Sequence, residues 1–227
     1  ISSRERLEKP ARKPPVLPDE AYSYDSMGNR LAPSNAAGEW QYSADNELLS
    51  RPGSSGPVTY DQDADGNRVS KTENGEVATY VYNLSNRLTQ VWQGEEGSGT
   101  KVASYHYDPF GRRLWKEVDG ERTFYLYSDE GLIGEYDSTG SELKTYGRLP
   151  DAPWGTNPLF LKQDGTFYWY LNDRQGTPQK LVMSNGLVVW SARYDAFGNC
   201  TIETEAVTNN LRFAGQYYDA ETGLHYN

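Results

Sequence analysis

The chain has 227 residues, with 32 acidic and 22 basic side chains and a formal net charge of -10. This acidity disfavours a nucleic-acid-binding protein, because phosphate contacts need clustered lysine and arginine. Leu, Ile, Val and Phe together make up only about 18% of the residues, a level typical of disordered chains, but the 18 Tyr and 6 Trp supply large rings for a core. The composition therefore disfavours helical bundles and doubly wound α/β folds.

Residues 1–20 are charged at first and then contain four prolines. Such a segment favours an extended linker or a strap lying over the rest of the fold. No run approaches the ~18 consecutive apolar residues of a membrane-spanning helix. The chain begins at Ile1 rather than Met and ends in a strand-like pattern at Tyr226. We therefore expect a fragment of a longer protein.

Residues 21–227 contain a repeat in which a tyrosine is followed by Asp or Asn and then by Gly and a polar residue. Ten tyrosines serve as anchors about every 21 residues, from Tyr24 to Tyr217. The motif occurs at Tyr24, Asp25 and Gly28, at Tyr60, Asp61 and Gly66, at Tyr107, Asp108 and Gly111, and at Tyr194, Asp195 and Gly198, with a looser copy at Tyr82.

Each repeat predicts one β-hairpin. Aspartate bonds its own backbone in turns, and glycine accepts the positive φ that a tight reversal needs. A second reversal lies between repeats, as at Asn74-Gly75, where Asn-Gly is a strong hairpin signal. About two strands per repeat give roughly 20 antiparallel strands, which must stack on one another to bury a face. The predicted fold is an all-β, long curling sheet.

The repeats resemble the YD repeats of the Rhs family. The more specific resemblance is the segment at residues 211–227, which is similar to the end of an Rhs core. Its motif residues are Arg212, Phe213, Gly215, Gln216, Tyr217, Asp219, Glu221, Thr222, Gly223, Leu224 and Tyr226.

The resemblance implies a β-sheet that spirals into a hollow shell, or β-cocoon, around a C-terminal toxin domain. Polymorphic toxins, the C components of Tc toxins and teneurins carry related shells. In the family, a self-cleavage site and the toxin follow the motif that ends this chain. We therefore expect no catalytic residue and no cofactor here. The expected partners are the remainder of the shell, the enclosed toxin, and a secretion spike or chaperone, with no nucleic acid and no membrane segment.

The resemblance further implies a secreted protein, exported by type VI secretion or a similar route. A cargo of ~100 residues has a radius near 17 Å, so its shell needs a sheet midline at ~25 Å. Twenty strands at ~4.8 Å cover only part of that circumference. We therefore expect this chain to form less than one turn of a cargo-sized shell.

Other chemistry receives weaker support. His106 and His225 are far apart in sequence, and Cys200 has no nearby histidine, so structural roles are favoured over a metal or nucleophilic site. Residues 61–67 open like a calcium loop, but the twelfth position is Thr72 instead of glutamate. A turn rich in aspartate is the favoured interpretation, and no metal is expected.

The rival hypothesis is a secreted or surface carbohydrate-binding or adhesion protein. The densest aromatic group is Trp154, Tyr168, Trp169 and Tyr170, which would form the platform for a sugar. Buried core is the favoured role for these rings, because the chain has few aliphatic residues to bury.

Overall fold

The structure is a computed structural model that describes residues 21–33 and 38–227, where every regular element is a β-strand. The predicted strap at residues 1–20 lies outside this part. The strands are β1 (Tyr22–Tyr24), β2 (Arg30–Pro33), β3 (Gln41–Tyr42), β4 (Leu48–Pro52), β5 (Pro57–Gln62), β6 (Arg68–Glu73), β7 (Glu76–Tyr82), β8 (Leu88–Gln93), β9 (Thr100–Tyr107), β10 (Arg113–Val118), β11 (Glu121–Ser128), β12 (Gly131–Tyr136), β13 (Glu142–Arg148), β14 (Pro158–Gln163), β15 (Thr166–Asn172), β16 (Pro178–Val182), β17 (Val188–Tyr194), β18 (Cys200–Glu205), β19 (Tyr217–Asp219) and β20 (Leu224–Tyr226).

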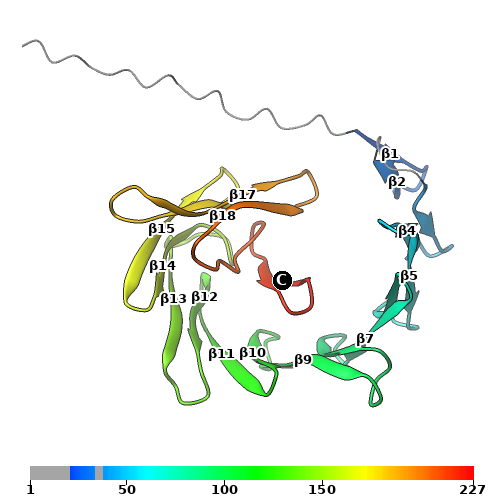
Figure 1. Ribbon diagram of the computed structural model, residues 1–227, viewed down its shortest axis with the longest axis horizontal. Helices are drawn as coiled ribbons and strands as arrows, with labels where there is room; N and C mark the ends of the chain where they lie inside the picture. Colours follow the sequence, from blue (N-terminus) through cyan, green and yellow to red (C-terminus); the bar gives the residue numbers. More distant parts are fainter. Residues whose placement is uncertain (1–20, 34–37) are drawn as a thin grey trace, which may run out of the picture.

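Strands β3 to β18 form one sixteen-stranded antiparallel sheet in which each strand pairs with its neighbours in sequence. Two further hairpins, β1–β2 and β19–β20, form separate two-stranded sheets. The sheet curls around the C-terminal part of the chain, which lies inside the curve (Figure 1). The predicted fold class, antiparallel hairpin repeats in a curling sheet, is confirmed.

The motif turns have a shared geometry. In the first, the Asp25 carboxylate accepts hydrogen bonds from the backbone N–H of Met27 and Asn29, at 2.9 and 2.7 Å. Gly28 has a φ of 87°, a conformation that costs glycine little and other residues much. The carboxylates of Asp108 and Asp195 accept the equivalent pairs of backbone hydrogen bonds in their own turns. Local chemistry thus fixes each reversal.

The second copy of the motif differs from its prediction. Asp61 lies within β5 and accepts a hydrogen bond from Ser70. The turn is bound by Asp63, whose carboxylate accepts from the backbone of Asp65 and Asn67. Tyr24 directly precedes the aspartate of its turn. Tyr60 lies two residues further upstream of its own turn aspartate and is buried.

The motif turns connect odd-numbered strands to the next even-numbered ones, so they lie in a row at the same ends of the strands. Hydrogen bonds join several neighbouring turns in this row. The Asn67 side chain donates to the side-chain oxygen of Asn86 at 3.0 Å, and Asn29 does the same to Asn46 at 2.9 Å. Arg87 donates to the carbonyl oxygen of Gly111 at 2.9 Å. These bonds join the first turn to the second, the third to the fourth, and the fourth to the fifth.

Register shifts occur beside the motif turns, for example between Val81 and Tyr82 and between Arg113 and Trp115. A β-bulge bends its strand and increases the local twist. Repeated bulges therefore explain why the sixteen strands curl instead of lying flat.

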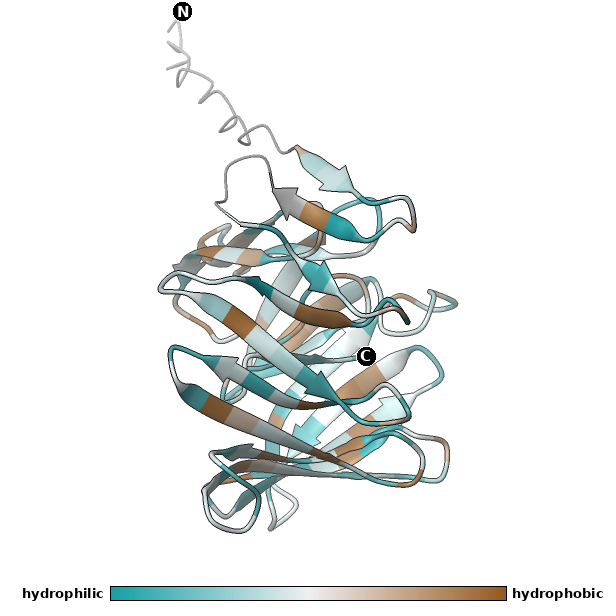
Figure 2. Ribbon diagram, turned by 90° about the vertical axis from the view of Figure 1, so that its right-hand side faces the viewer, coloured by the Kyte–Doolittle hydropathy of each residue, from teal (hydrophilic) through white to brown (hydrophobic). Residues whose placement is uncertain are grey.

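The core lies on the concave face. Hydrophobic and hydrophilic residues alternate along the strands (Figure 2), as expected when one face of a sheet is buried. One buried cluster includes Tyr125, Tyr146, Leu161, Tyr170 and Trp190, and a smaller one contains Tyr80, Val91, Ala103 and Tyr105. Tyrosine thus replaces aliphatic residues in much of the core.

One end of the large sheet meets the separate β1–β2 hairpin at a seam. The ring of Phe197, in the β17–β18 turn, packs edge-on against Tyr22 of β1, with centroids 4.7 Å apart. The guanidinium of Arg30 lies 4.3 Å from the Phe197 ring, 4.5 Å from Tyr22 and 4.8 Å from Trp40. Three aromatic rings from distant parts of the chain therefore surround one cation.

The expected partial turn referred to a shell around a separate cargo domain, and it stays a prediction. In the described residues, the concave face packs against the C-terminal part of the same chain, and the β17–β18 hairpin contacts the β1–β2 hairpin after one winding. Within the described ranges, no helix is long and apolar enough to span a membrane.

Candidate functional site

The candidate site is the contact between the concave face and the C-terminal segment, defined as residues 206–227. After β18 the chain leaves the sheet and turns inward. Asn209 is almost completely buried, and its side-chain oxygen accepts a hydrogen bond from the Tyr170 hydroxyl of β15 at 2.8 Å. Asn210 accepts from the Lys144 ammonium group of β13 at 2.7 Å. Two asparagines thus fix the point where the segment enters.

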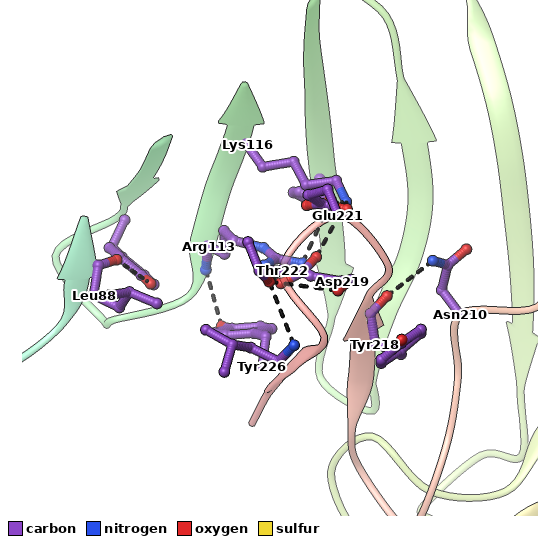
Figure 3. A network of polar contacts seen from close by, with 12 residues as sticks. Leu88, Arg113, Lys116, Asn210, Tyr218, Asp219, Glu221, Thr222 and Tyr226 are labelled. Carbon is purple, nitrogen blue, oxygen red and sulfur yellow. Dashed lines mark hydrogen bonds and ion pairs between the residues drawn. The ribbon is translucent and has the colours of Figure 1, made fainter. Parts of the chain in front are cut away.

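A buried ion pair holds the far end of the segment. Arg113 of β10 donates to the carboxylate of Asp219 in β19 at 2.5 Å, and the two side chains are 2% and 3% exposed. The backbone N–H of Arg113 also donates to the Tyr226 hydroxyl at 2.9 Å (Figure 3). Strand β10 therefore binds both strands of the β19–β20 hairpin.

Aromatic rings enclose the Arg113 guanidinium. Its central carbon lies 4.7 Å from the Tyr125 ring and 5.4 Å from the Tyr105 ring, both in the sheet. The Tyr217 and Tyr226 rings of the C-terminal segment lie at 5.1 and 4.6 Å. Burial alone would lower the pKa of Arg113, but Tyr125 and Asp219 outweigh it and raise the pKa, so the group stays charged.

A second cation extends the ion pair. Lys116 of β10 contacts Asp219 at 3.1 Å and Glu221 at 2.9 Å. These contacts surround a tight turn in which the N–H groups of Thr222 and Gly223 donate to the Asp219 carbonyl oxygen. Sheet and segment therefore carry complementary charges where they meet.

Burial also shifts the tyrosines around the site. Desolvation raises the pKa of Tyr107 to about 12, and it raises the pKa of Tyr105 and of Tyr217 further. These phenols are neutral at ordinary pH. They act as hydrogen-bonding and packing groups around the ion pair.

The structure brings the predicted core-associated motif together as the inner part of this site. Arg212, Tyr217 and Asp219 are buried. The Arg212 guanidinium lies over the rings of Trp190 and Tyr218 and donates to backbone carbonyls. Phe213 packs near Tyr194, Gly215 has a φ of 87°, and Leu224 packs against the smaller core cluster. The repeat anchors, in contrast, lie in the surrounding sheet.

The sequence motifs do not include the sheet residues that receive this segment, which are Arg113, Lys116 and Lys144. Arg112 precedes Arg113 directly, yet its side chain is 38% exposed and bonds its own turn through Asp108. The signal that separates the two arginines is strand alternation after the turn, which a bulge at this position obscures.

The other candidate groups lie apart. His106 stacks on Trp115 with centroids 5.5 Å apart, while His225 lies against Tyr218 in the C-terminal segment. Cys200 is half-buried, and this burial raises the pKa of its thiol, which lowers its reactivity. Asp63, in the calcium-like turn, binds the side chain and backbone of Asn67.

The aromatic group of the rival hypothesis is divided between environments. Tyr170 is buried and binds Asn209, whereas Trp169, the preceding residue, packs with Phe160 and Phe167 on the opposite face. Trp154 stacks on Tyr127, with centroids 5.8 Å apart. Tyr168 is partly buried against the larger core cluster. The four residues therefore do not form one platform, and the predicted buried-core role is wrong for Trp154 and Trp169, which are 46% and 45% exposed.

A curling sheet of tyrosine-anchored hairpins that encloses its own C-terminal segment defines a YD-repeat shell segment. The chain belongs to the teneurin YD-shell family, whose model matches residues 16–226. This finding confirms the resemblance inferred from the repeats.

Relatives occur in bacteria and animals. The chain is 30% identical to tRNA nuclease WapA of Bacillus subtilis over 216 residues, which cover 90% of the chain and 9% of WapA. It is 26% identical to double-stranded DNA deaminase toxin A of Burkholderia cenocepacia (92% of the chain, 16% of the relative) and 29% identical to teneurin-3 of Mus musculus (89% and 7%). The chain thus spans a small part of each relative.

Among solved structures, the crystal structure of TcdB2-TccC3-TEV matches 91% of this chain and 15% of its own, with a TM-score of 0.47 and 16% identity.

Proposed function

We propose that this chain is a structural segment of a toxin shell, which encloses a toxin domain and keeps it sequestered until delivery. The observation that carries the proposal is the buried Arg113–Asp219 pair, by which the concave face holds a segment of polypeptide inside the curled sheet. Relatives named as toxins support it, including WapA, the deaminase toxin and toxin protein Tse5 of Pseudomonas aeruginosa.

The proposed role of these residues is not enzymatic. The chain spans 9% of WapA, 16% of the deaminase toxin and 20% of Tse5, which leaves most of each relative for its activity. Tyrosine rings and turn aspartates, the most frequent features of the repeats, have packing and turn-forming roles in the fold. We assign the toxic activity to a separate domain.

The proposal includes secretion, by a type VI system or a similar route. The partners are further windings of the shell, the enclosed toxin domain, and a secretion spike or chaperone. An acidic chain of net charge -10 fits a container better than a nucleic-acid-binding surface.

Limited proteolysis of the gene product that contains these residues tests the proposal. The toxin region should resist trypsin while the sheet is folded, and it should be cut once urea unfolds the sheet, as followed by tryptophan fluorescence. Cutting of the toxin region at full speed while the sheet remains folded would contradict sequestration.

A further inference from the structure

A groove of about 360 Å³ lies on the concave face beside the C-terminal segment. Strands β6 to β9 form its floor, and the turn that contains Glu221 and Thr222 forms one wall. The lining residues on these strands include Lys71, Glu73, Glu76, Ala78, Tyr80 and Val91. The C-terminal segment leaves this part of the sheet uncovered.

The floor of the groove is apolar and continues the interface just described. Tyr80 and Val91 belong to the smaller core cluster, and Ala78 and Val102 pack against it. Leu224 of β20 packs on the same cluster. The surface that already receives one segment of chain therefore extends beyond that segment.

The walls of the groove are acidic. The carboxylates of Glu73, Glu76 and Glu221 line it together with a single ammonium group, Lys71. Lys71 is paired with Glu73 at 2.6 Å and Lys116 with Glu221 at 2.9 Å, so the three lining carboxylates exceed the cations paired with them by one negative charge. An occupant with positive charges at its ends would complement these walls, and one with negative charges would be repelled.

We propose that this groove binds an extended segment of the enclosed toxin polypeptide, in which aliphatic side chains are flanked by lysine or arginine. The proposal rests on the proposed shell function and names one surface through which the shell contacts its cargo. Aliphatic side chains on alternate residues would pack on Ala78 and Val102, which are partly exposed beside the buried Tyr80 and Val91. The flanking cations would meet Glu76 at one end and Glu221 at the other.

Two variants on one strand test the groove. Ala78→Arg places a bulky cation on the floor. Val81→Arg places the same residue on the opposite face of β7, because Val81 follows Tyr80 and side chains alternate along a strand. The probe is a fluorescent peptide, acetyl-Lys-Val-Ser-Val-Thr-Val-Lys-amide. The control peptide has Glu in place of both lysines.

The lysine peptide should bind the unaltered chain at least tenfold more tightly than the glutamate peptide. Ala78→Arg should weaken its binding at least tenfold, and Val81→Arg should change it less than twofold. The proposal is overturned if the unaltered chain binds the lysine and glutamate peptides equally. It is also overturned if the Ala78→Arg and Val81→Arg variants bind the lysine peptide equally. So does a dimer of this chain that Ala78→Arg dissociates, because a second copy would then be the occupant.

Failure of the groove and failure of the shell function have different signatures. If the toxin region resists trypsin but no peptide binds, the groove inference is wrong and sequestration stands. If the toxin region is cut while the sheet is folded, the shell function itself is wrong, whatever the peptides do.

Discussion

Arg113 and Asp219 lie 106 positions apart in the chain, and their side chains meet at 2.5 Å with almost no exposure to solvent. A buried charge is costly unless it is paired and hydrogen-bonded. This pair therefore couples the curvature of the sheet to the position of the C-terminal segment.

Removing the charge of Asp219 should be strongly destabilising. Asp219→Asn keeps the size of the side chain but leaves Arg113 buried without its carboxylate, and we expect a loss of about 3–5 kcal/mol in the free energy of unfolding. Urea titration followed by tryptophan fluorescence measures it. Glu203→Gln is the control, because its pair with Arg193 is more than a third exposed and should change stability by less than about 1 kcal/mol. Equal losses of stability in both variants would contradict the burial of the Arg113–Asp219 ion pair.

The seam gives a second prediction with a matched control. Phe197 packs on Tyr22 and Arg30, whereas Phe110 occupies the same position of an equivalent turn and is 83% exposed. Phe197→Ala should cost about 1–3 kcal/mol through lost aromatic and cation–π contacts and should speed hydrogen exchange in β1 and β2. Phe110→Ala loses an exposed cation–π contact with Arg112 of its own turn, so it should cost less than about 1 kcal/mol and leave exchange in β1 and β2 unchanged. Unchanged exchange in Phe197→Ala would show that the seam does not hold the hairpin.

The turn-to-turn bonds give a third prediction. Asn67→Ala removes the donor shared by Asp63 and Asn86 and should cost about 1–2 kcal/mol, which lowers the melting temperature by roughly 2–8 °C in a chain of this size. The same change should raise the pKa of Asp63, because the Asn67 hydrogen bond is the main cause that lowers it. Asp65→Ala, at the exposed tip of this turn, serves as the control in calorimetry. Identical melting temperatures for the two variants would refute the bridging role.

Tyrosine burial predicts the response to alkali. Desolvation raises the pKa of Tyr107 from 10.0 to about 12 and raises that of Tyr80 and Tyr82 as well. The unfolded chain therefore ionises first, so the stability from these neutral phenols is fully present below about pH 10 and is lost as the pH rises toward 12. Phenolate absorbance and circular dichroism should change together in one transition. Ionisation of most tyrosines near pH 10 with the sheet intact would contradict this burial.

Local signals made much of the fold predictable. A turn such as Asp108 to Gly111 is determined by the hydrogen bonds of one aspartate and the φ of one glycine, and both are readable from neighbouring residues. The turn after Asp61 shows where local signals are not sufficient. Around Asp61 the sequence offers three aspartates within five positions, and only the fold shows that Asp63 binds the turn.

The site was less predictable because its contacts are long-range. The motif around Asp219 identified one half of it, but the other half lies on β10, where a bulge obscures the strand alternation that distinguishes buried Arg113 from its neighbour Arg112. Likewise, Trp169 and Tyr170 are adjacent in sequence and face opposite sides of the sheet. Burial and strand register decide these roles, and both depend on how the whole sheet curls.

Hydrogen exchange of the C-terminal segment tests the central claim most directly. If the concave face holds this segment through Arg113 and Asp219, the amides of β19 and β20 should exchange as slowly as those of β10 and β11, because release would break the buried ion pair. Exchange of residues 217–226 at the rate of a free peptide, with β10 and β11 still protected, would contradict the account.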